Sequence, residues 1–163
     1  MIIINKSGYL KYKDFKFKCA LGKAGIGNKK SEGDNITPKG DFRIIKIYYR
    51  KDRLKKLSSQ FTLTEITKNI GWCDDPKSRK YNKPIKLPTK YGHEILYRRD
   101  NIYDLILVLN YNMKPTIKNK GSAIFIHVGK KNYKKTAGCI ALKKADLIYL
   151  VTGIKKNTRV LIN

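Results

Sequence analysis

Two residues that could perform nucleophilic chemistry lie twelve positions apart in the C-terminal third of the chain. His127 follows the apolar run Ile124-Phe125-Ile126, and Cys139 follows Gly138 in a turn of small residues. A thiolate is a strong nucleophile, and histidine can take the thiol proton and later protonate a leaving amine. A glycine permits a sharp turn, whose backbone N–H groups can stabilise an oxyanion. The same spacing also fits a buried structural cysteine near an unrelated histidine.

The other two cysteines are less suited to chemistry. Cys19 lies in FKFKCAL, where apolar and basic residues alternate as in a half-buried strand with the thiol facing the core. Cys73 lies in the turn-like segment GWCDDP, where a structural role alone would explain its presence. An odd number of cysteines without a CxxC pair leaves at least one free thiol and gives no metal signature. We therefore expect no metal and no cofactor.

The elements that must position these residues are short β-strands. Runs rich in Ile, Val, Phe and Tyr are separated by turn sequences such as GDNITPKGD at 33–41. A helix is expected from about residue 143 to a stop at Gly153, and residues 51–57 suggest one or two charged helical turns. The sequence predicts a mainly β (α+β) single domain, residues 1–163. The predicted strands cover residues 2–4, 9–12, 15–21, 42–48, 103–109, 123–128 and 158–162.

Residues 68–97 have a different character. They contain three prolines and several aromatic residues and show little periodicity. Long irregular segments of this kind are commonly binding loops or lids, although a plain surface excursion is as common. We expect a lid or capping segment. Its candidate substrate-binding residues, each of which could instead serve local packing, are Trp72, Tyr81, Asn82 and His93.

The net charge is strongly positive, with 37 Lys+Arg against 12 Asp+Glu, giving +25. Such a surface attracts polyanions, including anionic cell-wall polymer, membrane headgroups and nucleic acid. The basic residues are spread along the whole chain, and neither zinc-finger spacing nor an RNP-type motif is present. We therefore expect no nucleic-acid function. The N-terminal residues MIIINKSGYLKYK are typical of a strand and a turn, not of a signal peptide.

Two motifs, in the right order, resemble one enzyme family. HVGKKNYKKTAGCIAL, residues 127–142, resembles the catalytic segment of L,D-transpeptidases, the YkuD-like family: a histidine, a loop, then [ST]-x-G-C and an apolar residue. GKAGIGNKKSEGDNITPKGDFRI, residues 22–44, resembles that family's upstream signature. GWCDDP, Tyr81-Asn82 and YGHE at 91–94 are similar to a compact proteobacterial branch. The resemblance covers nearly the whole chain and implies a YkuD-like β-sandwich.

The resemblance also implies roles and partners. Cys139 matches the acylated nucleophile, His127 the general base, Gly138 and Cys139 the oxyanion donors, and Thr136 the hydroxyl residue of the motif. The implied reaction is acyl transfer on peptidoglycan stem peptides. The thiolate attacks the carbonyl of an L-residue, usually diaminopimelate, expels a D-amino acid and passes the acyl group to an amine of another stem. The links are of the 3→3 or 1→3 type, and water as acceptor gives an L,D-carboxypeptidase. We expect a monomer that lies in the periplasm and is inhibited by β-lactams.

The sequence departs from the family pattern at three places. Ala137 replaces the histidine of the motif, Ala141 replaces an arginine, and the loop between His127 and Thr136 has only eight residues. Position 137 contributes mainly its backbone, whereas an arginine at position 141 would bind acidic groups near the site. The candidates to replace that arginine are Lys134, Lys135 and Arg98. The alternative to an enzyme is a basic binding module for cell-wall polymer or nucleic acid.

Overall fold

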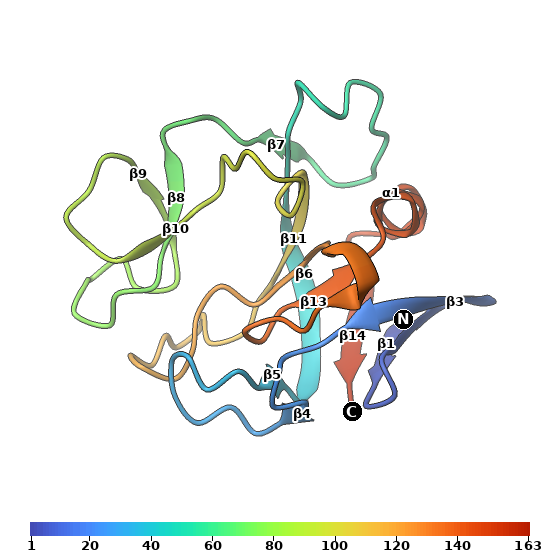
Figure 1. The fold of residues 1–163 in the computed structure, drawn as a ribbon, viewed down its shortest axis with the longest axis horizontal. Coiled ribbons are helices and arrows are strands. Elements are labelled where there is room, and N and C mark those ends of the chain that lie inside the picture. The colour runs from blue at the N-terminus through green and yellow to red at the C-terminus, as the bar shows by residue number, and fades with distance from the viewer.

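A computed structural model describes residues 1–163, and β-strands dominate it (Figure 1). The one α-helix is α1 (Lys144–Gly153), and a short 3-10 turn, η1, spans Lys131–Tyr133. The mainly β fold predicted from the sequence is confirmed. The strands are β1 (Ile2–Asn5), β2 (Tyr9–Tyr12), β3 (Phe15–Ala20), β4 (Ile26–Gly27), β5 (Thr37–Pro38), β6 (Gly40–Tyr49), β7 (Leu63–Glu65), β8 (Ile70–Cys73), β9 (Pro84–Lys86), β10 (His93–Ile95), β11 (Leu105–Leu109), β12 (Phe125–Val128), β13 (Ile140–Leu142) and β14 (Arg159–Ile162).

The main sheet runs in the order β11-β12-β13-β3-β2-β1-β14-β6-β7, and a further pairing of β6 with β11 closes it. Two strands turn the corners. β3 pairs with β2 through residues 15–18 and with β13 through 19–20, while β6 pairs with β14 through 40–43 and with β11 through 44–49. Strands that pass from one sheet to another in this way join two packed layers. The result is a sandwich whose sheets are continuous at both corners.

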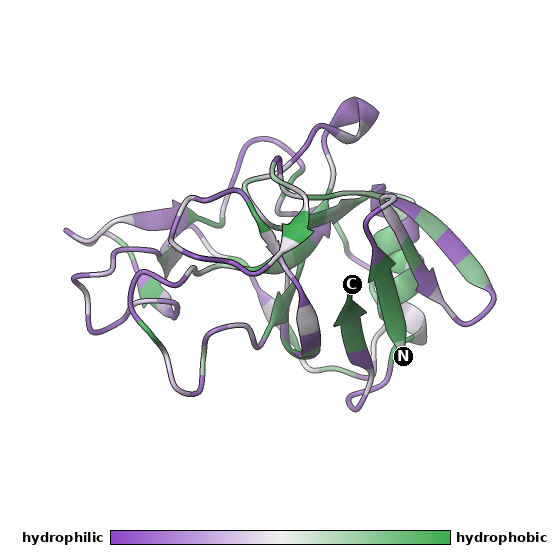
Figure 2. Cartoon of the chain, turned by 90° about the horizontal axis from the view of Figure 1, so that it is seen from below, coloured by the Kyte–Doolittle hydropathy of each residue, from purple (hydrophilic) through white to green (hydrophobic).

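The main core fills the space between the layers. Side chains alternate along a strand, so Ile2 and Ile4 of β1 and Val160 and Ile162 of β14 all face inward and are fully buried. Burial of each such side chain contributes roughly 1.5–3 kcal/mol. The strands carrying them are the strongly apolar ones in Figure 2. Cys19 belongs to this core, as predicted, and burial raises its pKa to about 12.

A second, smaller cluster lies on the opposite face of β11 and β12. Ile106 and Val108 pair with His127 and Phe125, and all four project away from the main core. The other residues of β11 face inward, so this strand is buried on both faces, as the run DLILVL indicates. Trp72 and Leu96 of the 68–97 segment cover the outer face. This covered face carries His127, with the apolar residues of the cluster packed around it.

The 68–97 segment is more regular than expected. β8, β9 and β10 form a separate three-stranded sheet, seen at the left of Figure 1. The strands are only three or four residues long and are interrupted by glycine and proline, so no alternating pattern reveals them. Cys73, expected in a turn, lies buried on β8 opposite His93 of β10.

Residues 51–57 do not form a helix, contrary to the expectation. A single turn is closed by the N–H of Leu54 donating to the carbonyl of Arg50. Arg53 instead reaches the buried carboxylate of Asp104 at 2.7 Å, and Lys144 binds the same carboxylate at 2.8 Å. Leaving the buried carboxylate unpaired would cost more free energy than a short helix would contribute, because helix nucleation is unfavourable.

The helix near the C-terminus is where it was predicted, but Gly153 is its last residue and not the stop after it. The hydroxyl of Tyr12 donates to the carbonyl of Gly153 at 2.5 Å. This bond satisfies a carbonyl that the helix end would otherwise leave open. The α1 side chains buried in the main core are Leu147, Leu150 and Val151. No helix of the structure has the length and apolarity needed to cross a bilayer.

The loop between β4 and β5 is organised by Asp34. Its carboxylate accepts hydrogen bonds from the Lys29 ammonium at 2.5 Å and from the backbone N–H groups of Lys30, Ser31 and Ile36. Burial alone would raise the pKa of Asp34, but these four donors lower it to about 2. A carboxylate held by several N–H donors fixes a loop in one conformation. This loop packs against the turn that presents Cys139.

We expect Asp34→Asn to lower the free energy of unfolding by about 1–3 kcal/mol at pH 7, because the amide cannot replace the ion pair. The native pKa is about 2 against 3.8 in the absence of the fold, so the stabilisation is complete above pH 3.8 and disappears as the pH falls through 2. Urea unfolding at several pH values measures this. Asp14→Asn, in an exposed turn, is the matched control. A stability difference that stays constant down to pH 2 would contradict the assignment.

Candidate active site

The register of two neighbouring strands brings the predicted pair together. β12 and β13 are parallel, with His127 opposite Ala141. Residues two apart on a strand share a face, so Cys139, two positions before Ala141, projects on the same face as His127. Phe125 lies on this face too and is fully buried there. The apolar residues that alternate with them face the main core and fix the register.

The turn before β13 is closed by a threonine side chain. The Thr136 hydroxyl donates to the carbonyl of Cys139 at 2.6 Å and accepts the N–H of Gly138 at 3.1 Å. Gly138 has φ +141°, and a Cβ at this position would lie 2.9 Å from the carbonyl oxygen of Ile36. Only glycine meets both conditions. Thr136 therefore shapes the turn that presents the thiol.

The upstream signature lies directly against this turn. Thr136 forms an isolated bridge with Gly22: its N–H donates to the carbonyl of Leu21 and its carbonyl accepts the N–H of Lys23, both at 2.9 Å. Gly22 is required because a Cβ there would be 2.2 Å from the carbonyl of Asn35. The two motifs that are far apart in the sequence thus form one structural unit.

The thiol of Cys139 lies among backbone groups and apolar side chains. Its sulfur donates to the carbonyl of Ala123 at 3.0 Å and accepts the N–H of Phe125 at 3.4 Å. Burial raises the pKa of Cys139 to about 12, and the Phe125 N–H offsets only part of the effect. Ala123 has φ +52° and is held by its N–H, which donates to the Asn82 side chain at 3.1 Å. Asn82 thereby positions the carbonyl that binds the thiol.

The imidazole of His127 is buried and oriented. Its Nδ1 lies 2.9 Å from the carbonyl of Val128. A carbonyl can only accept, so Nδ1 carries the proton and Nε2 is free to accept one. Burial lowers the pKa of His127 to about 4. Thiol and imidazole are both neutral at pH 7 and are not hydrogen-bonded to each other, so the thiolate–imidazolium pair expected from the sequence does not describe this state.

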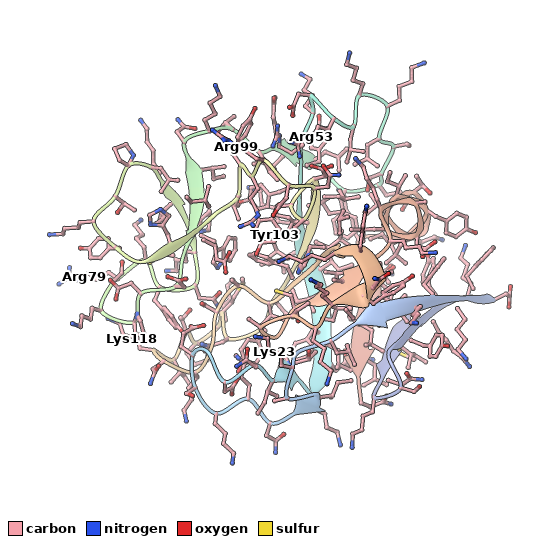
Figure 3. The ribbon with its side chains drawn as sticks, in the orientation of Figure 1. Lys23, Arg53, Arg79, Arg99, Tyr103 and Lys118 are labelled. Carbon is pink, nitrogen blue, oxygen red and sulfur yellow. The ribbon has the colours of Figure 1, made fainter.

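One residue that the sequence analysis did not single out, Tyr103, lies next to the histidine. The ring of Tyr103, near the centre of Figure 3, meets the His127 ring edge-on with centroids 5.4 Å apart. Its hydroxyl donates to Glu94 of β10 at 3.0 Å, and the guanidinium of Arg98 lies 5.5 Å from its ring. Burial raises the pKa of Tyr103 well above its usual value. No spacing rule predicts these contacts, because they run from Glu94 of the 68–97 segment through Tyr103 to His127 of β12.

The four residues proposed for the lid have structural contacts. The indole N–H of Trp72 donates to the Asn82 side chain at 3.1 Å, and the Asn82 amide group donates to two backbone carbonyls. The Tyr81 hydroxyl donates to Glu32 and is itself buried. His93 lies on β10, with Nδ1 2.7 Å from the carbonyl of Tyr91. Trp72 packs on Phe125 on the face that carries Cys139, and Asn82 holds the residue whose carbonyl contacts the thiol.

A cavity of about 320 Å³ opens beside His127. Thr136, Ala137 and Ala141 line it, so the missing arginine of the motif would have projected into it. Of the proposed replacements, Lys134 and Lys135 line the cavity, whereas Arg98 binds Asp100 through two hydrogen bonds of 2.7 and 2.8 Å. The remaining lining residues are Lys23, Ile102 and Lys130.

Comparison with protein families gives one match. The model of the YkuD family, the L,D-transpeptidase catalytic domain, matches residues 1–162. A comparison with curated proteins found no match. The family match spans essentially the whole chain, and proteins of this family act on peptidoglycan stem peptides. The chain therefore belongs to the L,D-transpeptidase catalytic domain family and is an enzyme of that type.

Proposed function

We propose that the protein is a cysteine L,D-transpeptidase that forms 3→3 or 1→3 cross-links between stem peptides through an acyl-enzyme on Cys139. The observation that carries this proposal is the parallel register of β12 and β13, which directs Cys139 and His127 to one face. A thiol and an imidazole with a free Nε2 on one face are the components of thiol acyl transfer. The proposed location is the periplasm, where this substrate lies.

In the first step, the donor carbonyl approaches the sulfur while Nε2 of His127 accepts the thiol proton. The neutral thiol has a pKa of about 12 and the imidazole about 4, so the proton leaves as the carbon–sulfur bond forms and not before. The N–H of Cys139 has no acceptor in the structure and is available to the oxyanion. The N–H of Gly138 is shared with the Thr136 hydroxyl.

In the second step, the protonated His127 gives its proton to the leaving amine, and the D-amino acid departs. The acceptor amine then attacks the thioester carbonyl and passes a proton to the same Nε2. The carbon–sulfur bond breaks, and the departing Cys139 thiolate takes that proton back, which restores the neutral thiol and imidazole. Both steps require the imidazole to keep one orientation, which Val128 fixes through Nδ1 and Tyr103 through its edge-on ring contact. Tyr103 is in this scheme a positioning residue.

We expect Cys139→Ala to abolish cross-linking while changing the melting temperature little, because the residue lies at a half-buried turn. The assay is incubation with disaccharide-tetrapeptide muropeptides followed by mass spectrometry. The fragmentation of the dimer distinguishes 3→3 from 1→3 links, and a tripeptide product alone indicates a carboxypeptidase. Cys19→Ala is the control: it lowers stability but retains turnover, since Cys19 lies in the main core. Cross-linking by Cys139→Ala would overturn the proposal.

We expect a carbapenem to acylate Cys139 alone, because its strained carbonyl resembles the acyl donor. Cys19 and Cys73 are buried, whereas Cys139 is partly exposed. Peptide mapping by mass spectrometry locates the adduct, with the Cys139→Ala variant as the blank. An adduct on Cys73 would show that the wrong thiol has been chosen.

The pH dependence of acylation tests the role of His127. The base must be neutral to accept the thiol proton, and its pKa is lowered from 6.5 to about 4. The acylation rate should therefore be constant from pH 7 to about pH 5 and fall as the pH approaches 4. Stopped-flow acylation by a carbapenem measures the profile. A midpoint near 6.5 would contradict the buried base.

Substitution of the two histidines separates their roles. His127→Gln should slow acylation at neutral pH by roughly a hundredfold or more, the usual effect of losing a general base. His93→Gln is the matched control and should keep both rate and profile, because its ring hydrogen-bonds to the carbonyl of Tyr91 within the three-stranded sheet. The opposite result would assign the base to His93.

A further inference from the structure

The β2–β3 hairpin projects from the sandwich at the end opposite to the three-stranded sheet (Figure 1). Two aromatic side chains meet at its outer end: Phe15 of β3 is 45% exposed and Tyr149 of α1 is 44% exposed, with ring centroids 4.6 Å apart. Behind them, Phe17 stacks on Phe15 and packs against the main core. The two exposed rings therefore form one supported apolar patch, and such patches commonly mark an interaction site.

The apolar face of the hairpin continues past the edge of the core. Leu10 and Tyr12 of β2 share one face with Phe15 and Phe17 of β3, and the alternation with lysine is visible at the right of Figure 2. Leu10 is fully buried, Phe17 is partly buried and Phe15 is exposed, so burial decreases towards the turn. β13 pairs with β3 only at residues 19–20. The alternation thus places an aromatic ring where the sandwich no longer covers it.

Basic side chains surround this patch. Residues 9–20 carry four lysines, all of them exposed, and one carboxylate, that of Asp14. In α1 the only acidic residue is Asp146. The lysines of the outer hairpin face lie on aromatic rings: the Lys16 ammonium is 4.0 Å from the centroid of the Tyr9 ring. The hairpin end therefore combines an apolar tip with an excess of positive charge.

A hollow of about 360 Å³ adjoins the hairpin tip. Tyr12 lies at its wall, and Lys13, Lys155 and Arg159 line it, whereas no acidic residue does. Arg159 binds Asp41, but neither lysine belongs to an ion pair. The Tyr12 hydroxyl donates to the last carbonyl of α1, so the hairpin and the segment that follows the helix are held together here. Two unpaired ammonium groups from separate segments thus face one hollow.

Rings and lysines together indicate which partner fits. Aromatic side chains favour the boundary between lipid headgroups and acyl chains, and lysines beside them bind anionic headgroups. A soluble polyanion would use the lysines but not the exposed rings. A second copy of the chain would need about 800 Å² from each partner, whereas two half-exposed rings offer on the order of 200 Å². The chemistry therefore favours an anionic lipid surface.

We infer that the hairpin end, defined by Phe15, Tyr149, Lys13 and Lys155, docks the protein on an anionic lipid bilayer. The two rings enter the headgroup boundary, and the two lysines bind lipid phosphates. The three-stranded sheet lies at the opposite end of the molecule and so points away from the lipid (Figure 1). This inference concerns a surface outside the catalytic face and does not depend on the proposed function.

Sedimentation with vesicles tests the docking surface. The full chain should bind vesicles of equal parts phosphatidylglycerol and phosphatidylcholine at least about tenfold more strongly than vesicles of phosphatidylcholine alone, and added salt should weaken the binding. Phe15→Ser should lower the partition coefficient for the anionic vesicles by roughly tenfold or more. Lys13→Gln/Lys155→Gln should lower it by a similar factor, because each lysine near the surface strengthens binding about fivefold.

Matched variants control for hydrophobicity and charge elsewhere. Ile117→Ser removes a side chain that is 55% exposed, and Lys55→Gln/Lys56→Gln removes two exposed lysines; both should keep the wild-type partition. Equal binding to both kinds of vesicle would overturn the proposal. So would wild-type binding by Phe15→Ser, or an equal loss in Lys55→Gln/Lys56→Gln, since either result assigns the binding to diffuse charge. A dimer in vesicle-free solution that Phe15→Ser dissociates would identify a second copy as the partner.

A spectroscopic variant tests insertion even if Phe15→Ser is unstable. The chain has one tryptophan, Trp72, which is 3% exposed in the cluster beneath the three-stranded sheet. In Phe15→Trp, brominated phosphatidylglycerol should quench the added indole and its emission should shift to the blue, whereas the emission of Trp72 in the wild type should not change. Binding of Phe15→Trp to these vesicles without quenching would refute docking through the hairpin end.

Discussion

The parallel pairing of β12 with β13 is the constraint on which the rest of the site depends. Most neighbours in the main sheet are antiparallel, but here both strands run the same way. A hairpin cannot connect such strands, so the chain must cross over through residues 129–139. The crossover carries the lysines past His127 and ends in the turn that presents Cys139. This one pairing therefore fixes the relative positions of His127 and Cys139 and requires the long loop between them.

Burial sets the protonation states of Cys139 and His127 and also makes the pair less reactive. The same apolar face that orders Phe125 raises the pKa of Cys139 and lowers that of His127. A neutral pair is less reactive than a thiolate, and a protein that kept a thiolate there would have to stabilise an isolated charge. Substrate binding that brings a carbonyl to the sulfur lets the proton move only when the bond forms. In the proposed mechanism, the buried base therefore couples thiol activation to substrate binding.

Hydrogen bonds of the segment that covers this face keep it in one conformation. Asn82 connects Trp72, Ala123 and the 111–112 backbone through its side chain, so the carbonyl facing the thiol is held by the 68–97 segment. Tyr103 joins the same segment to the histidine through Glu94. Trp72 and Asn82, which the sequence analysis proposed for substrate contact, also satisfy buried donors and acceptors, and an unpaired polar atom at such a position is costly.

The sequence by itself determined the fold class, the main strands and the candidate pair of Cys139 and His127, because alternation and turn residues act over a few neighbouring positions. It did not reveal β13 or the strands of the 68–97 segment, which are too short to show a period. Only the tertiary structure decided that Gly138 must avoid the Ile36 carbonyl, that Tyr103 meets His127, and that four lysines from two loops line one cavity. Those contacts join residues far apart in the chain, and burial, which sets both pKa values, exists only after the sheets have packed.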